Sequence, residues 1–357
     1  MPTLQEAPHT FLFPVEEKRI EKSDTFQIQN RRFLGNKHKL LNFIVDIVTC
    51  QCGEIKSLCD IFAGTGVVGH RFNTKHIKVI SNDVLYSNFL PLKTFLKATH
   101  IDINKLQKKL DILNNLTPES ENYFSKHFGG TYFTKKNARK IGAIRKTIEK
   151  MDVNDDERAA LVTSLLYAID KIANTVGHYD AFMKDLDRSQ TMRLLMPRIQ
   201  PENNNNNEIF REDANKLIKK IKCDVLYIDP PYNSRQYCDS YHLLENLACW
   251  EQPTVYGKAK KMDRAHLKSK YSLKEAPNIF EDLILNAKCK HILMSYNNTG
   301  ESKDIRSNAR IKDDEIMHIL KRRGKVKVFE RGHQAFTAGK SSTTAHKERV
   351  FYCEVLK

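Results

Sequence analysis

Four consecutive residues, Asp229-Pro230-Pro231-Tyr232, combine groups that could bind a planar base. They follow the apolar run Val225–Ile228, and an aspartate at the end of such a strand lies where ligands bind in open α/β sheets. The two prolines fix the backbone and remove amide donors, which leaves carbonyl oxygens available to accept hydrogen bonds. Tyr232 offers a flat face for stacking. The alternative is a rigid turn whose aspartate only caps the next segment.

A glycine-rich turn earlier in the chain is the second group of residues that could bind a ligand. Gly64 and Gly66 lie within Asp60–Gly69 (DIFAGTGVVG), and they would let the backbone approach a ligand closely. No Gly-Lys-Ser/Thr follows, so the turn is not a nucleotide-phosphate loop. Asp83 follows the next predicted strand, a position that commonly accepts hydrogen bonds from a ribose. Together they predict a nucleoside-type cofactor site, although each could also be purely structural.

Both groups need a parallel α/β sheet to bring them together. The order strand, glycine turn, helix, strand is the opening unit of such a sheet, and short apolar runs later in the chain supply more strands. We therefore predict an α/β fold with a doubly wound, mostly parallel sheet. The predicted helices are Leu40–Val48 and Glu157–Ala173, and the predicted strands are Ile55–Phe62, Ile77–Ser81, Val225–Ile228, His291–Ser295, Lys325–Phe329 and Arg349–Leu356.

The change from strand-like to helical hydrophobic patterns along the sequence suggests a core domain interrupted by one insertion. Residues 1–30 form a polar N-terminal arm, residues 31–88 and 209–357 form the core, and residues 89–208 form a mainly helical insertion. The insertion ends near Pro201–Glu208, which contains five consecutive asparagines. We expect that run to be a solvated loop.

The motif order resembles that of the Dam-like adenine-specific DNA methyltransferases. In that group a lysine-containing motif comes first, then an FxGxG turn, then a target-recognition insertion and finally DPPY. The corresponding segments here are Arg32–Lys37 (RFLGNK), Phe62–Gly66, the helical block and Asp229–Tyr232, so the resemblance covers roughly residues 31–84 and 213–237. It implies the S-adenosylmethionine-dependent methyltransferase fold, with the insertion as the target-recognition region.

The resemblance also implies a set of cofactor-binding residues. Phe33 and Lys37 would touch S-adenosylmethionine, Asp83 would hold its ribose hydroxyls, and Asp213 would contact its adenine. Phe33 departs from the Tyr or Trp that is common in the group, which keeps stacking but removes a hydroxyl contact. The full implied set is Phe33, Lys37, Asp60, Phe62, Gly64, Gly66, Asp83, Asp213 and Asp229.

For the reaction, the resemblance implies methyl transfer to the exocyclic amino group of adenine in duplex DNA. That nitrogen is a poor nucleophile because its lone pair is delocalised into the ring. The Asp229 carboxylate and the Pro230 carbonyl would accept its two hydrogens and offset the developing charge. Tyr232 would stack on the adenine once the base has been flipped out of the duplex. No metal is required.

Charge and the loop after DPPY indicate the DNA contacts. Lys and Arg number 59 against 43 Asp and Glu, a formal net charge of +16, which favours a polyanionic partner. Arg235 and Tyr237 follow the motif and are candidate DNA contacts, as are Lys258, Lys260 and Lys261 in the basic stretch Lys258–Lys274. An ordinary surface loop and a solvated charged face are the alternatives.

Other function classes remain to be weighed. Cytosine amino methyltransferases more often carry Ser at the position of Asp229, and RNA adenine enzymes more often carry Asn, but both stay open as alternatives. A catalytically inactive DNA-binding protein on the same scaffold is the alternative from another class. We expect the modification enzyme of a restriction-modification system, with a separately encoded endonuclease as its functional counterpart. The recognition sequence has no signature in the chain.

Composition and the lengths of the apolar runs indicate the cellular compartment of the protein. The apolar runs are too short to cross a bilayer, and no secretory signal is visible, so we expect a cytoplasmic protein. We also expect it to be a monomer. The eight cysteines are scattered without any CxxC pair, which favours reduced structural thiols over zinc ligation.

Overall fold

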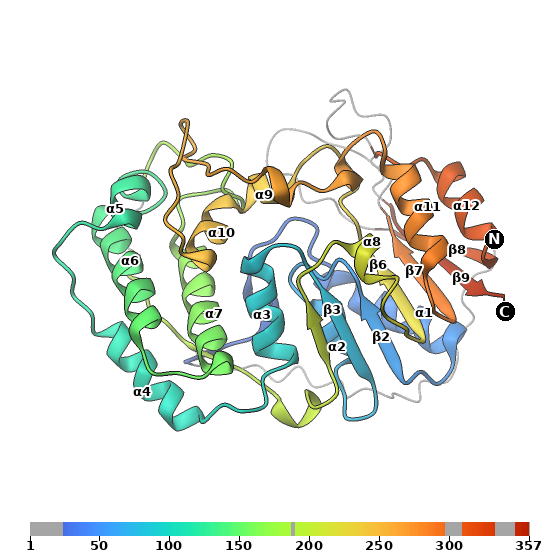
Figure 1. Cartoon of the computed structure of the whole chain (residues 1–357), viewed down its shortest axis with the longest axis horizontal. Coiled ribbons are helices and arrows are strands. Elements are labelled where there is room, and N and C mark those ends of the chain that lie inside the picture. The colour runs from blue at the N-terminus through green and yellow to red at the C-terminus, as the bar shows by residue number, and fades with distance from the viewer. Residues whose placement is uncertain (1–23, 187–189, 297–308, 333–346, 357) are drawn as a thin grey trace.

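A seven-stranded mixed sheet organises the computed structural model, which describes residues 24–186, 190–296, 309–332 and 347–356 (Figure 1). Five neighbouring strands are parallel, and the last strand of the sequence is antiparallel to both of its neighbours. This confirms the predicted α/β class with a mostly parallel sheet. In spatial order the strands are β5 (Glu208–Phe210), β3 (Lys78–Asn82), β2 (Ser57–Asp60), β6 (Val225–Ile228), β7 (His291–Ser295), β9 (Lys347–Val355) and β8 (Gly324–Gly332).

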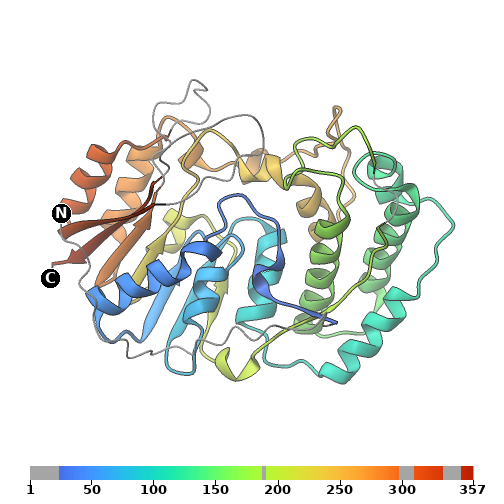
Figure 2. The same ribbon diagram turned by 180° about the vertical axis from the view of Figure 1, so that it is seen from behind.

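Helices cover both faces of the sheet, as the apolar strands require. Successive strand residues point to opposite faces: Leu58 packs in one core and Cys59 in the other. The first core is covered by α1 (Leu41–Cys52), α2 (Val67–Phe72) and α3 (Tyr86–Leu96). The second core is covered by α8 (Ala214–Leu217), α11 (Ala276–Asn286) and α12 (Asp313–Lys321) (Figures 1 and 2).

A second, helical lobe lies beside the sheet (Figure 1). It has its own apolar core, in which the long helix α7 (Asp155–Ile172) is buried at every residue from Ala159 to Asp170, as expected for a helix packed on all sides. The lobe includes α10, which comes after the DPPY motif in the sequence. Its helices are α4 (Ile103–Asn114), α5 (Tyr123–Phe128), α6 (Lys135–Lys150), α7 (Asp155–Ile172), α9 (Tyr237–Ser240) and α10 (His242–Cys249).

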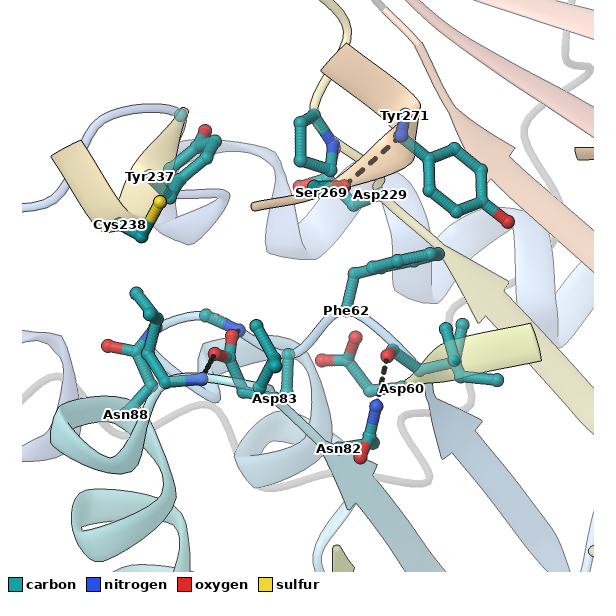
Figure 3. Close-up of a pocket in the computed structure, with 18 of the residues that line it drawn as sticks. Asp60, Phe62, Asn82, Asp83, Asn88, Asp229, Tyr237, Cys238, Ser269 and Tyr271 are labelled. Atoms are coloured by element: carbon teal, nitrogen blue, oxygen red, sulfur yellow. Dashed lines mark hydrogen bonds between the residues drawn. The ribbon is translucent and has the colours of Figure 1, made fainter. Parts of the chain in front are cut away.

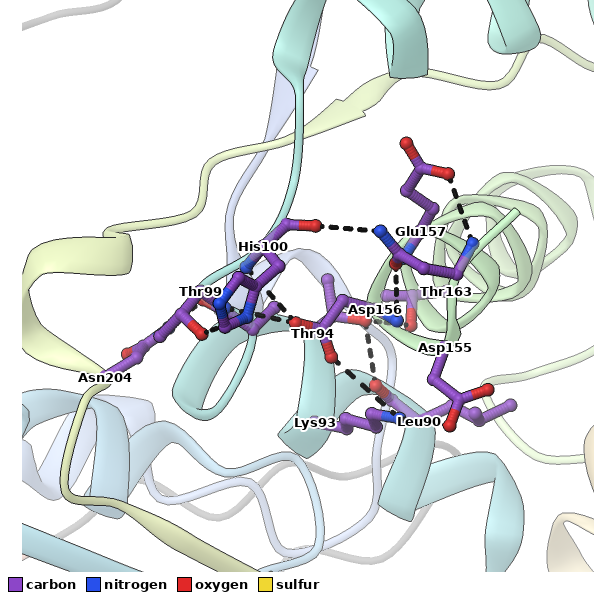
Figure 4. A network of polar contacts seen from close by, with 12 residues as sticks. Leu90, Lys93, Thr94, Thr99, His100, Asp155, Asp156, Glu157, Thr163 and Asn204 are labelled. Atoms are coloured by element: carbon purple, nitrogen blue, oxygen red, sulfur yellow. Dashed lines mark hydrogen bonds and ion pairs between the residues drawn. The ribbon is translucent and has the colours of Figure 1, made fainter. Parts of the chain in front are cut away.

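Buried polar contacts join the lobe to the sheet. The Glu245 carboxylate on α10 accepts hydrogen bonds from the backbone of Tyr86 and Ser87, both at 2.8 Å, and so caps the N-terminus of α3. At the other end of α3, the hydroxyls of Thr94 and Thr163 lie 2.9 Å apart between α3 and α7 (Figure 4). Since α3 also packs on β3 and β5, these contacts fix the lobe relative to the sheet edge.

The asparagine run is only partly the solvated loop that we expected, since Asn205 and Asn206 are exposed but two of its members are buried. Asn204 and Asn207 are 0% and 1% exposed, and their side chains hold the start of β3 and the end of α3. Asn207 accepts from the backbone of Val79 at 2.8 Å and donates to the carbonyl of Leu96 at 2.8 Å. The expectation was wrong for these two residues because side-chain amides can satisfy buried backbone groups that no regular element reaches.

The predicted elements are otherwise present, with shifted ends. The helix predicted at Leu40–Val48 is α1, and the strand predicted at Val225–Ile228 is β6 with the same bounds. The edge strand β5 was not predicted, because three half-buried residues carry no clear pattern. Short elements complete the fold: β1 (Thr25–Phe26), β4 (Met196–Pro197), η1 (Ile28–Asn30), η2 (His38–Leu40), η3 (Pro201–Asn203), η4 (Ala265–Leu267) and η5 (Lys270–Ser272).

Of the predicted N-terminal arm, residues 1–23 lie outside the described residues, while Phe26 and Ile28 pack in the first core. All eight cysteines are unpaired thiols. Among the described residues, no helix has the length and apolar character needed to span a membrane.

Candidate active site

A pocket opens at the carboxyl ends of the parallel strands, where ligands of such sheets bind (Figure 3). The ends of β2, β3 and β6 contribute Asp60, Asp83 and Asp229 to its wall. The sequence therefore placed these three carboxylates correctly relative to the strands. Since parallel strands end at one edge, residues separated by more than a hundred positions meet here.

The glycine turn shapes the floor of the pocket between β2 and α2. Gly64 and Gly66 have φ angles of +53° and +78°, which favour glycine. A Cβ on Gly66 would lie 2.4 Å from the Cδ2 of Leu92, so this position also lacks space for a side chain. The turn is held by hydrogen bonds from the Ala63 amide to the Asn82 carbonyl, 2.9 Å, and from the Gly66 amide to the Ala63 carbonyl, 2.7 Å.

Asp83 is locked against the same turn. Its carboxylate accepts from the backbone amide of Gly64 at 3.0 Å and from that of Leu85 at 2.8 Å. Burial raises the pKa of Asp83 to about 6, and these hydrogen bonds limit the rise. The carboxylate is thus fixed in orientation at the edge of the pocket.

Asn82 ties the ends of three strands together. Its side chain donates to the carbonyls of Ile61 and Glu212, at 3.1 and 3.0 Å, and accepts from the Glu212 amide at 3.0 Å. Asp213 then caps α8 by accepting from the amide of Lys216 at 3.1 Å. The sequence did not single out Asn82, because a bridging amide has no distinguishing pattern.

Lys37 reaches the DPPY motif from the N-terminal side. Its ammonium group lies 3.0 Å from Oδ2 of Asp229 and 3.2 Å from the carbonyl of Gly35. Residues 192 positions apart thus form an ion pair in the pocket, with both side chains largely shielded from solvent. The resemblance placed Lys37 at the cofactor but gave no sign of this pairing.

Asp60 is the most deeply buried acid of the pocket. It is 1% exposed, and its Oδ1 has no hydrogen-bond partner within the described residues. Burial raises the pKa of Asp60 to about 8, the Asp229 carboxylate adds to the rise, and the backbone amide of Gly69 offsets part of it.

An aromatic stack forms one side of the pocket. The rings of Phe33 and Tyr241 are parallel with centroids 4.6 Å apart, and Tyr237 stacks on Phe33 at 5.3 Å. The Tyr237 hydroxyl donates to the carbonyl of Leu34 at 3.2 Å, which fixes the segment that carries Lys37. Behind the stack, the buried guanidinium of Arg31 lies 5.6 Å from the centre of the Phe33 ring.

Part of the basic stretch Lys258–Lys274 borders the pocket, which the sequence did not suggest. The side chain of Gln236 donates to the Ser269 carbonyl at 3.0 Å and accepts from the Ser269 amide at 2.8 Å. Tyr271 is buried edge-on against Phe62, with centroids 4.9 Å apart. The segment that follows DPPY is therefore attached to this border by one bidentate side chain.

Most of the predicted cofactor residues line one pocket. Gly66 does not line it but shapes the turn. Tyr232 lies outside the lining, edge-on to Tyr296 at 6.4 Å, and Pro230 is buried beside it. The predicted residues in the pocket wall are Phe33, Lys37, Asp60, Phe62, Gly64, Asp83, Asp213 and Asp229.

The predicted DNA contacts occupy different environments. Arg235 and Lys258 are exposed, and Lys258 lies in a turn between the bridged residues Tyr256 and Lys261. Lys261 pairs with Asp180 of the helical lobe at 2.7 Å. Tyr237 belongs to the aromatic stack of the pocket. Their roles toward DNA stay predictions.

Comparison with known proteins identifies the family to which the chain belongs. Residues 33–323 match the family model of the D12 class N6 adenine-specific DNA methyltransferases. The chain therefore belongs to that family and is an adenine-specific DNA methyltransferase. Of the alternatives left open by the sequence, cytosine and RNA as targets are thereby set aside.

Individual relatives agree with the family. The chain is 33% identical to the type II methyltransferase M.NlaIII of Neisseria lactamica over 88% of this chain and 95% of that protein. It is 33% identical to the type II methyltransferase M.FokI of Planomicrobium okeanokoites and 36% identical to the modification methylase StsI of Streptococcus sanguinis. It spans 52% and 46% of those two longer proteins.

Proposed function

We propose that this enzyme transfers a methyl group from S-adenosylmethionine to the N6 amino group of adenine in double-stranded DNA. The observation that carries the proposal is the convergence of the glycine turn, Asp83 and Asp229 on one pocket at the sheet edge. The pocket fits the cofactor chemically, because it combines carboxylates, an aromatic wall and a backbone turn with no space for a Cβ. When bound, S-adenosylmethionine supplies a methyl group on a positively charged sulfur.

Different residues of the pocket would contact different parts of the cofactor. The rigidly held Asp83 carboxylate would accept hydrogen bonds from the ribose hydroxyls, and Phe62 and Asp213 would hold the adenine ring. Phe33 and Lys37 would border the methionine part. Each of these side chains is fixed by contacts of its own, so the pocket is organised in advance of binding.

Asp229 and Pro230 perform the chemistry on the target base in this proposal. The carboxylate and the carbonyl accept the two hydrogens of the adenine amino group, which favours a more tetrahedral nitrogen and stabilises the charge that develops there. Tyr232 stacks on the adenine after the base leaves the duplex. The carbonyl of Tyr232 accepts from the Arg310 amide at 2.7 Å, which holds the backbone of the motif in place.

The biological setting follows from the relatives. We propose that the protein is the modification enzyme of a restriction-modification system, since its relatives are type II methyltransferases and modification methylases. In that role it acts as a monomer on cytoplasmic DNA, and a separately encoded endonuclease is its functional counterpart.

Substitution of Asp229 tests the catalytic proposal. Asp229→Ala should lower methyl incorporation from labelled cofactor into duplex DNA by at least about a hundredfold, because one of two preorganised acceptors is lost. The exposed Asp314→Ala serves as the control and should keep full activity. Circular dichroism would verify the fold of both variants. An active, folded Asp229→Ala enzyme would disprove the role.

A further inference from the structure

Asp60 differs from Asp83 and Asp229 because one oxygen of its carboxylate is buried without a hydrogen-bond partner among the described residues. Asp83 accepts two backbone hydrogen bonds, and Asp229 is paired with Lys37. The Oδ1 of Asp60 has no hydrogen-bond partner among the described residues. Figure 3 shows this carboxylate turned toward the interior of the pocket, between Phe62 and Asn82.

The groups that face Asp60 from neighbouring elements are mostly negative. Asp229 comes from the end of β6 and Asp83 from the end of β3, while α2 contributes the backbone amide of Gly69. Lys37 is the one cation among these influences, and it lies 3.0 Å from Asp229. The floor of the pocket thus carries a surplus of negative charge.

A buried carboxylate without a counter-ion is costly unless a cation arrives to compensate it. S-adenosylmethionine carries an ammonium, a carboxylate and a sulfonium, for a net charge of one positive. The product S-adenosylhomocysteine has a neutral thioether in place of the sulfonium. We infer that Asp60 is a specificity-determining residue, the counter-ion that makes the enzyme prefer the charged cofactor over the uncharged product. This inference rests on the proposed function.

The counter-ion role of Asp60 would couple cofactor binding to the release of a proton. Burial raises the pKa of Asp60 to about 8, so the group is mostly protonated and neutral at pH 7 without a ligand. A bound sulfonium favours the ionised form, and binding therefore releases a proton below about pH 8. By linkage, affinity for S-adenosylmethionine should increase as the pH rises toward 8 and level off above it. The thioether product should show a weaker dependence.

Calorimetric titration of the full chain without DNA measures this directly. S-adenosylmethionine and S-adenosylhomocysteine are titrated at about pH 7 in phosphate and in Tris, whose ionisation enthalpies differ, to obtain the number of protons released. We expect more protons released with S-adenosylmethionine than with the product. In Asp60→Asn that difference should disappear. The affinity for S-adenosylmethionine relative to that for S-adenosylhomocysteine should also fall by about tenfold, because the charged form of the carboxylate no longer favours the sulfonium. Asp314→Asn, exposed on α12 and outside the pocket lining, is the control and should keep the difference.

The possible results separate the inference from the proposed function. If the wild-type chain binds neither compound, the proposed cofactor is wrong. If both compounds bind with equal proton release and equal pH dependence, or if folded Asp60→Asn keeps the wild-type affinity ratio, the counter-ion role is wrong. Should Asp60→Asn fail to fold, the wild-type comparison of the two compounds still decides, because it needs no variant.

Discussion

The floor and the rim of the pocket are built in different ways. The floor (Asp60–Gly66 and Asn82–Leu85) is held by hydrogen bonds that join the ends of neighbouring strands, such as the 2.9 Å bond from the Ala63 amide to the Asn82 carbonyl and the bonds of the Asn82 side chain. The rim (Leu34–Lys37, Gln236 and His266–Tyr271) is held mainly by side chains, including the bidentate contact of Gln236 with Ser269 and the ion pair of Lys37 with Asp229.

This difference assigns different tasks to the two regions. Backbone bonds at the ends of buried strands open only with the sheet itself, so the floor keeps a single geometry for the cofactor. Loops held by a few side chains open at a lower free-energy cost, which suits a border that ligands must cross. Substitutions in the floor should therefore affect folding and cofactor binding together, and substitutions in the rim should affect binding more than folding.

The largest effect is expected for Gly66→Ala in the floor. A methyl group there meets Leu92 and a backbone φ of +78°, so we expect a loss of about 2–4 kcal/mol in the free energy of unfolding together with a loss of cofactor binding. Gly257→Ala is the matched control, since its φ is +66° but nothing lies within 4 Å of the added Cβ. Thermal and urea unfolding would measure both. Equal losses in the two variants would show that crowding in the floor is unimportant.

Asn207→Ala should produce the next largest effect. It leaves the Val79 amide and the Leu96 carbonyl without their buried partner, at a cost of about 2–3 kcal/mol. The exposed Asn205→Ala, two positions away, should change the free energy of unfolding by less than about 0.5 kcal/mol. Urea denaturation of both variants tests whether the run supports the sheet beneath the floor.

Gln236→Leu should act on the rim. Loss of both hydrogen bonds to Ser269 should raise the KM for the cofactor about three- to tenfold, while the free energy of unfolding falls by about 1 kcal/mol. Gln236→Glu keeps the acceptor for the Ser269 amide and should have a smaller effect on KM. Steady-state kinetics at saturating DNA would separate KM from kcat. A variant that loses stability as severely as Gly66→Ala would contradict the division between floor and rim.

The smallest effect is expected for Lys258→Ala, on the exposed turn beyond the rim. Removal of one phosphate contact should weaken DNA binding a few-fold and lower the slope of log affinity against log salt by about 1, without altering cofactor affinity. Lys108→Ala, exposed on α4, should leave the salt slope unchanged. Binding assays at several salt concentrations measure both. An unchanged slope for Lys258→Ala would remove this lysine from the DNA interface.

The sequence predicted the floor far better than the rim. Strands such as Val225–Ile228 are short, apolar and followed by functional residues, so the sheet edge and the carboxylates Asp60, Asp83 and Asp229 could be placed together. Parallel strands then determine which residues meet. The glycines of the turn were recognisable because their backbone angles exclude most other residues.

The rim could not be predicted because its contacts join distant polar residues without a pattern. Gln236 and Ser269 are 33 positions apart in irregular segments, and Lys37 is 192 positions before Asp229 in the sequence. The buried asparagines were missed for a related reason: their composition resembles that of a loop, and only the backbone groups around them show what they bind. Local sequence signals cannot reveal such long-range pairings.

The position of β9 has a consequence for the synthesis of the protein. This strand follows all the others in the sequence, yet it lies between β7 and β8 and pairs with both along most of its length. While the chain is still emerging from the ribosome, β9 has not been made, and the edge of β7 that will pair with it has no partner. An unpaired strand edge promotes association with other chains. The pocket-bearing strands can therefore form early, but the sheet that supports them closes only after residue 347 has been translated.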